Sequence, residues 1–210
     1  MHTSLYQIIC ICDEESQQRF VTSLETNRRL GIQATIIGYA NELLVDISLD
    51  IPLPYGPKWK MLEAIQTHSR ETCAEFLCIF DEDILLTTFP LQALINCMNT
   101  YPYIDIIVPV QQEDNRHWNI FHKSTIDSPH ILHSSQKGAF AYGCMLIRMD
   151  VFQKIDLSNI PHESLDDMAF HSTKTVLYNP WIVTHPFETP ARMARKKRKL
   201  KDGFKDSTKV

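Results

Sequence analysis

The chain has 210 residues, of which 44% are hydrophobic and 22% are charged. This composition is typical of a globular protein with an apolar core, and the length fits one domain. The net charge of -4 is unevenly divided: residues 191–210 carry nine Lys/Arg against two Asp, and residues 1–190 carry twelve Lys/Arg against 23 Asp/Glu. An acidic body argues against a nucleic-acid-binding domain, whose positive charge would cover a folded face.

Cysteine spacing and hydropathy indicate the cellular compartment. The six cysteines form no Cys-x-x-Cys pair and stand mostly inside apolar runs, which favours buried thiols over disulfides or a zinc site. The first residues lack the basic and long apolar segments of a signal peptide. No apolar run approaches the roughly 20 residues that cross a bilayer. We therefore expect a cytoplasmic protein.

Strands and helices alternate along the first half of the chain. Short, nearly continuous apolar runs are typical of buried parallel strands, and apolar residues at helical spacing separate them. The expected strands are Leu5–Cys12, Ala34–Tyr39, Phe76–Phe80 and Ile104–Val110, and the expected helices are Asp13–Leu30, Pro57–Arg70 and Leu91–Thr100. Gly31 ends the first helix and Pro57 opens the second. This alternation predicts an α/β fold with a doubly wound, mostly parallel sheet.

The second half begins with a polar segment, Gln111–Gln136, that is rich in histidine and aromatic residues. A loop of this length inside a compact domain is usually functional or disordered. The elements expected after it are the strand Gly143–Met149, the helices Asp150–Ile155 and Leu165–Ser172, and the strands Val176–Tyr178 and Trp181–Thr184. We expect one domain over residues 1–190 and a basic tail or linker over residues 191–210. A nuclear signal or a membrane-surface contact is the alternative for the basic run Arg195–Lys201.

Three consecutive acidic residues, Asp81-Glu82-Asp83, directly follow the run Phe76–Phe80. In an extended chain, Asp81 and Asp83 point to the same side. The carboxyl ends of parallel strands are where open α/β sheets bind ligands. Two converging carboxylates repel each other unless a cation lies between them, and Mg²⁺ and Mn²⁺ prefer oxygen ligands. The sequence therefore predicts a divalent metal that bridges to a diphosphate; a solvated acidic turn is the alternative.

Four motifs in one order resemble the nucleotide-sugar glycosyltransferases of the GT-A fold. An apolar strand with Asp-x-Asp stands about twenty residues after a Gly-x-Lys helix start. A glycine-containing strand, an acidic segment and a late histidine follow. These later motifs are Gly143–Arg148, Glu163–Asp167 and Trp181–His185. The match spans residues 5–190, and the compact size is similar to transferase domains encoded by large algal (chlorella) viruses. A viral origin would place the protein in the host cytoplasm.

The resemblance implies a single-domain GT-A (Rossmann-like) fold. It also implies an enzyme that moves a sugar from a nucleoside-diphosphate sugar, with UDP as the expected nucleotide, to a hydroxyl of a glycan or glycoprotein. Mn²⁺ (or Mg²⁺) would be held by Asp81, Asp83 and His185. The residues that it implies for donor and nucleotide binding are Cys10, Ile11, Cys12, Asp13, Tyr39, Lys58, Asp81 and Glu82. The family often has threonine or serine where this chain has Cys10–Asp13, which departs from the pattern in the nucleoside pocket.

Catalytic and acceptor residues are expected downstream. An inverting reaction needs a carboxylate that accepts the acceptor's proton, and Asp166 and Asp167 are the candidates because they open a helix after the glycine-containing strand. Either one could instead cap that helix. His117 and Trp118 suit hydrogen bonding and stacking with an acceptor sugar, and covering the sheet is their alternative role. No feature distinguishes a retaining from an inverting reaction.

These assignments have alternatives, both for single residues and for the function of the whole chain. His185 could be a surface residue, and Lys58 could belong to a solvated helix face. A nucleotidyltransferase also uses a carboxylate pair on a Rossmann-like sheet, but it usually has a Gly-rich, basic phosphate loop, and this chain has Asp13-Glu14-Glu15 after its first strand. A non-catalytic carbohydrate- or protein-binding domain is the remaining alternative. Further domains could follow the basic tail.

Overall fold

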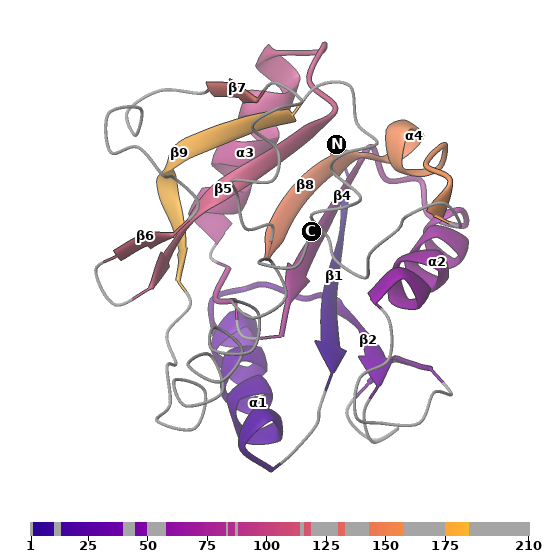
Figure 1. Cartoon of the computed structure of the whole chain (residues 1–210), viewed down its shortest axis with the longest axis vertical. Coiled ribbons are helices and arrows are strands. Elements are labelled where there is room, and N and C mark those ends of the chain that lie inside the picture. Colours follow the sequence, from indigo (N-terminus) through magenta and orange to yellow (C-terminus); the bar gives the residue numbers. More distant parts are fainter. Residues whose placement is uncertain are drawn as a thin grey trace, which may run out of the picture.

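The computed structural model describes residues 2–10, 14–39, 45–49, 58–82, 84–86, 88–113, 116–118, 130–132, 143–157 and 175–184. Helices and strands alternate through most of these segments (Figure 1). The strands are β1 Thr3–Cys10, β2 Thr35–Tyr39, β3 Ile47–Ser48, β4 Phe76–Asp81, β5 Ile106–Glu113, β6 Arg116–Trp118, β7 His130–Leu132, β8 Cys144–Arg148 and β9 Thr175–Thr184. The helices are α1 Glu14–Arg29, α2 Lys58–Ser69, α3 Thr88–Thr100 and α4 Met149–Phe152.

All described strands belong to one sheet, in the order β3-β2-β1-β4-β8-β5-β9-β7, with β6 paired to β5. Strands β1, β2, β3, β4, β5 and β9 share one direction, whereas β6, β7 and β8 run the opposite way. The predicted doubly wound, mostly parallel α/β sheet is therefore confirmed. The antiparallel β8, between β4 and β5, is the exception at the centre of the sheet.

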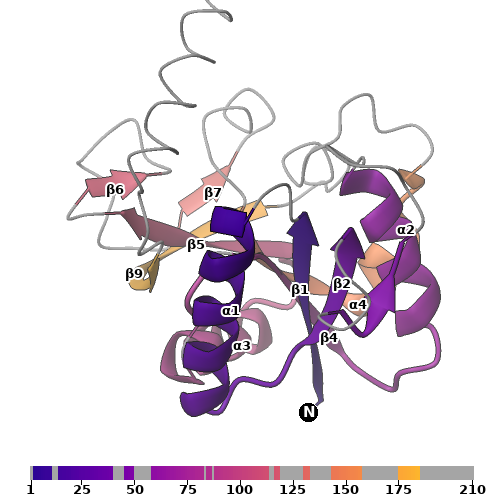
Figure 2. The ribbon, with the colours of Figure 1, turned by 90° about the horizontal axis from the view of Figure 1, so that it is seen from below.

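Helices cover both faces of the sheet (Figure 2). On one face, α2 and α4 pack through residues such as Leu62 and Phe152 against Leu77 and Ile79 of β4. On the other face, α3 packs against the alternate β4 residues Phe76, Cys78 and Phe80, and Phe20 of α1 packs against Ile36 of β2. Because successive strand residues point to opposite faces, a strand covered on both sides must be apolar throughout. The run Phe76–Phe80 meets that requirement, with every side chain buried.

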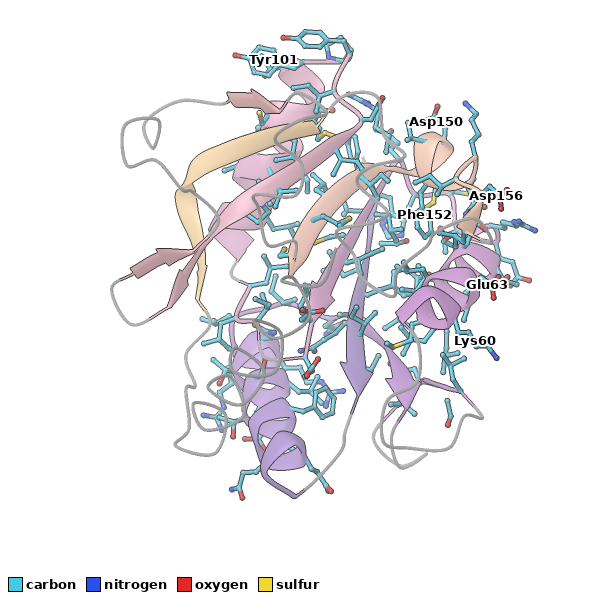
Figure 3. All side chains as sticks on the ribbon, in the orientation of Figure 1. Lys60, Glu63, Tyr101, Asp150, Phe152 and Asp156 are labelled. Carbon is cyan, nitrogen blue, oxygen red and sulfur yellow. The ribbon has the colours of Figure 1, made fainter. Side chains whose placement is uncertain are left out.

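The end of α1 shows how the sequence sets the bound of a helix. Gly31 has a φ of 83°, a conformation that glycine adopts without steric cost. It lets the amide of Ile32 donate to the carbonyl of Asn27 at 2.9 Å and close the helix. The predicted stop at Gly31 is therefore confirmed. In α4, Phe152 lies inside the protein, whereas Asp150 lies on its outer side (Figure 3).

Two sequence expectations were wrong. Val176–Tyr178 and Trp181–Thr184 form one strand, β9, rather than two. Between the pairs Pro109–Tyr178 and Gln111–Val183, β5 advances two residues while β9 advances five, and this bulge accommodates Pro180 within the strand. The segment Gln111–Gln136 is also not a single loop, because it contains the end of β5 and all of β6 and β7.

Among the four cysteines whose burial the structure describes, three follow the sequence expectation. Cys78, Cys97 and Cys144 are buried free thiols, as predicted, whereas the free thiol of Cys73 is exposed. No helix in the described part of the chain is long and apolar enough to cross a membrane. The predicted boundary between residues 190 and 191, and the helix expected over Leu165–Ser172, lie outside the described residues.

Candidate functional site

The predicted nucleotide-binding residues on β1, β2 and β4 come to one edge of the sheet. Cys10 is paired with Tyr39 across β1 and β2. Ile8, two residues before Cys10, is paired with Asp81 across β1 and β4. Asp81 therefore lies two residues, about 6.6 Å along the strand direction, short of the Cys10–Tyr39 pair. All three residues stand at the carboxyl edge of the sheet, where β1, β2 and β4 end (Figure 1).

Asp81 is the last residue of β4, and two hydrogen bonds fix its backbone. Its amide donates to the carbonyl of Gly143 at 2.8 Å, which connects it to the start of β8. Its carbonyl accepts from the amide of Ile84 at 3.2 Å, which closes a tight turn after the strand. The side chains of Asp81 and Glu82 are both partly buried. Asp83, which stands between Glu82 and Ile84 in the sequence, lies outside the described residues.

A buried thiol lies close to Asp81. The pKa of Cys144 is raised well above its ordinary value, first by a hydrogen bond with the Cys78 side chain and then by burial. Negative charge at Cys78 and at Asp81 contributes further. Cys144 therefore stays protonated near neutral pH, which makes it a poor metal ligand, since thiolates rather than thiols bind metals. The oxygen-rich pair predicted at Asp81 and Asp83 is the better match to a hard cation such as Mg²⁺.

The carboxyl end of β9 reaches the same edge of the sheet, farther along. Thr184 pairs with Gln112, and Gln112 lies beyond the level of Asp81 in the sheet. Strands β8 and β5 stand between β4 and β9, so the axes of β4 and β9 are about 14 Å apart. His185 directly follows this end and lies outside the described residues. A metal shared by Asp83 and His185 requires the segments after β4 and β9 to turn toward each other.

The remaining predicted site residues are distributed as follows. Lys58 is the first residue of α2, which precedes β4 and therefore begins on the side where β4 ends. His117 and Trp118 belong to β6, where they pair with Gln112 and Gln111. Ile11, Cys12, Asp13, Asp166 and Asp167 lie outside the described residues. Within the described ranges, no three His, Cys, Asp or Glu side chains gather in a group that could hold a metal.

Sequence reasoning missed three polar residues beneath the turn that follows Asp81. Gln7, Ser23 and Asn27 are almost fully buried, and their side chains bond the backbone of Glu82, Ile84 and Leu86. Two features could have indicated them. One is a glutamine within the apolar run Leu5–Cys12, and the other is a Ser/Asn pair four residues apart, which lies on one side of a helix.

The comparisons with known proteins concern the fold. No protein-family model matches the sequence, and no curated protein matches it significantly. Solved structures do match. A197 from STIV superposes with a TM-score of 0.52 at 13% identity, over 85% of this chain and 82% of A197.

Two further structures were solved with nucleotides bound. Residues 1–349 of S. aureus TarS in complex with UDP-GlcNAc give a TM-score of 0.59 at 8% identity, over 92% of this chain; the match spans only 61% of the TarS fragment. CMP:2-keto-3-deoxy-manno-octonic acid synthetase in complex with CTP gives 0.51 at 9% identity, over 97% of this chain and all of the synthetase chain. At these identities the likeness shows the fold alone, and that fold is a GT-A-like α/β domain.

Proposed function

We propose that this chain is a metal-dependent glycosyltransferase that moves a sugar from a UDP-sugar to a hydroxyl of a glycan or glycoprotein. The observation that carries the proposal is the place of Asp81. This carboxylate ends β4 at the carboxyl edge of a GT-A-like sheet, and Glu82 and Asp83 follow it in the sequence. Such an edge is where open α/β sheets bind ligands.

The structural neighbours support the nucleotide part of the proposal. TarS was solved with UDP-GlcNAc and the synthetase with CTP, so both bind a pyrimidine nucleotide. These neighbours support a nucleotide-sugar transferase-like fold. The paired ends of β1 and β2, at Cys10 and Tyr39, are the expected walls of the nucleoside pocket, together with the predicted segment through Asp13. Lys58 and Glu82 are proposed to lie beside the diphosphate and the ribose.

The metal that we propose is Mn²⁺ or Mg²⁺, held by Asp81, Asp83 and His185. The partly buried carboxylate of Asp81 fits such an ion, because it keeps access to a ligand and offers the hard oxygen that both ions prefer. An imidazole from His185 would favour Mn²⁺ over Mg²⁺. When bound, the ion would neutralise the charge that grows on the departing diphosphate.

Residues of this chain would bind the acceptor and take its proton. In the proposed reaction, the acceptor oxygen bonds to the anomeric carbon as the bond from that carbon to the diphosphate oxygen breaks. If the reaction inverts, Asp166 or Asp167 takes the acceptor's proton, which requires a carboxylate within hydrogen-bond reach of the hydroxyl. We propose that His117 and Trp118 on β6 contact the acceptor sugar, since aromatic and hydrogen-bonding side chains together suit a sugar ring.

A panel of nucleotide sugars tests the proposal. The protein is incubated with each sugar nucleotide and Mn²⁺, with and without EDTA, and the release of nucleoside diphosphate is measured. Release of UDP from a UDP-sugar that EDTA abolishes is the expected result. Release of pyrophosphate from a nucleoside triphosphate and a sugar would instead identify the nucleotidyltransferase. Binding of a sugar nucleotide without any release, in the presence of a range of acceptors, would point to the non-catalytic domain.

A further inference from the structure

Three buried polar side chains gather on the α1 face of the sheet, behind the turn that follows Asp81. Gln7 lies on β1, and Ser23 and Asn27 lie one turn apart on α1. Their exposed fractions are 1%, 0% and 2%. Apolar residues usually fill such an interface between a helix and a sheet, because a buried polar group is costly unless it is hydrogen-bonded.

The first two side chains bond the start of the segment 82–86. Gln7 Nε2 donates to the carbonyl of Glu82 at 3.1 Å and to Ser23 Oγ at 3.4 Å. Ser23 Oγ in turn donates to the carbonyl of Ile84 at 3.1 Å. Strand β1 and helix α1 are thereby both connected to the backbone directly after Asp81.

Asn27 bonds the rest of the segment from both ends of its amide group. Its Nδ2 donates to the carbonyl of Ile84 at 3.0 Å, and its Oδ1 accepts from the amide of Leu86 at 2.9 Å. Ile84 and Leu86 also bury their side chains completely. The backbone is thus held at Glu82, Ile84 and Leu86, although these residues follow the end of β4 in a connecting segment.

One feature of this network disfavours folding. Gln7 Oε1 is buried and has no hydrogen-bond partner in the described part of the chain. Rotating the amide group would not help, because Oε1 would then face the Glu82 carbonyl, which is also an acceptor. An apolar side chain of the same size would remove this buried acceptor, but it would also leave the Glu82 carbonyl without the Gln7 donor, so the glutamine brings little net gain in stability.

We propose that Gln7, Ser23 and Asn27 are positioning residues that fix the backbone after Asp81 and thereby orient the carboxylates of Asp81 and Asp83 toward the metal. This inference rests on the proposed function. It assigns the three residues no contact with the nucleotide sugar or the metal, because their bonds end on the backbone of residues 82–86. Their effect is comparable to that of groups that orient metal ligands from behind.

Ser23→Ala tests the positioning role, with Ser69→Ala as its matched control. Ser69 is equally buried at 1% exposure, and its hydroxyl also bonds a backbone carbonyl, that of Gln66. It ends α2, at the edge of the sheet opposite Asp81.

The measurement is the affinity for UDP at a series of Mn²⁺ concentrations, with the folded fraction of each variant checked. Ser23→Ala should weaken Mn²⁺-dependent binding about tenfold, in the range typical for groups that orient metal ligands. Ser69→Ala should leave it within about twofold.

Asn27→Asp provides the second variant. It keeps the acceptor for the Leu86 amide but sets an oxygen against the Ile84 carbonyl, so hydrogen exchange in residues 84–86 should quicken relative to Ser69→Ala. Faster exchange together with weaker UDP binding supports the proposal. Faster exchange with unchanged UDP affinity overturns it, as does a Ser23→Ala variant that binds like its control. A parent protein that binds no UDP with Mn²⁺ contradicts the proposed function itself.

Discussion

Gln7 of β1 donates a hydrogen bond to the carbonyl of Glu82, 3.1 Å away. The bond crosses from one strand to the residue that follows the neighbouring strand, because Gln7 is paired with Phe80 near the end of β4. A side chain from the interior of the sheet therefore constrains the chain directly after Asp81, the residue on which the proposed metal site depends.

Gln7→Met separates the stability of this arrangement from its proposed role. Methionine has a similar shape and removes the unpartnered Oε1, but it leaves the Glu82 carbonyl without this donor. These effects oppose each other, so we expect the free energy of unfolding to change by about 1 kcal/mol or less. Mn²⁺-dependent UDP affinity should fall about tenfold. A large loss of stability in denaturant titrations, with UDP affinity unchanged, would show that the glutamine serves the fold alone.

Arg148→Ala should give the opposite combination. The Arg148 guanidinium donates to the carbonyls of Ile104 at 2.7 Å and Met98 at 2.6 Å, and it lies over the ring of Phe76. Its pairing with Phe76 places it at the start of β4, far from Asp81. We expect a loss of about 2–4 kcal/mol in the free energy of unfolding, with UDP affinity unchanged wherever the variant is folded. Weaker UDP binding by the folded variant would contradict the view that Arg148, at the edge of the sheet opposite Asp81, serves the fold and not the binding site.

The buried strands were predictable from the sequence because each reads as a continuous apolar run. Phe76–Phe80 is the clearest case, since both of its faces are covered by helices and no polar position interrupts it. The late strand was less predictable. Asn179-Pro180 indicates a break in the sequence, and only the bulge opposite Pro109–Gln111 allows β9 to continue through it. Strands β6 and β7 lie in a polar region and pair at the margin of the sheet, so no apolar pattern indicates them.

The candidate site was predictable only in part. Asp81 stands out because it follows a buried strand, and pairing brings the backbones of Cys10 and Tyr39 to the same edge. The contacts of Ser23 and Asn27 were not predictable, because they join α1 to residues about sixty positions later in the chain. Local spacing carries no information about such a pairing.

The cysteines provide a test of the described core. Cys73 should react readily with a thiol reagent in the folded protein, whereas the buried Cys78, Cys97 and Cys144 should react only on unfolding. Burial also raises the pKa of Cys97, and that of Cys144 is raised well above its ordinary value. Because the folded protein holds these thiol protons more tightly than the unfolded chain does, the free energy of unfolding falls as pH rises above the thiol pKa of the unfolded chain, about 8.5. Mass-spectrometric mapping that finds Cys144 labelled as fast as Cys73 at neutral pH would contradict the described burial.

Trp118→Ala tests the acceptor side. Trp118 of β6 is paired with Gln111 of β5, at the margin of the sheet and away from β1 and β2. We expect sugar transfer to slow about tenfold, which corresponds to about 1.4 kcal/mol of lost contact with the acceptor, while UDP affinity stays the same. Tyr103→Ala is the control, because Tyr103 is an aromatic residue with 48% exposure in the connection before β5. Equal effects of both changes on transfer, or a loss of UDP affinity in Trp118→Ala, would remove Trp118 from the acceptor site.

The most direct test of the central claim is calorimetric titration of UDP into the parent protein, Asp83→Ala and Asp150→Ala, each in Mn²⁺ and in EDTA. Asp150 is a matched control, since it is an exposed aspartate just after β8, at the edge of the sheet opposite Asp81. The parent and Asp150→Ala should bind UDP in Mn²⁺ and lose that binding in EDTA. Asp83→Ala should lose at least about tenfold in affinity in Mn²⁺. Equal Mn²⁺-dependent affinity in Asp83→Ala and the parent would contradict a metal site at the end of β4.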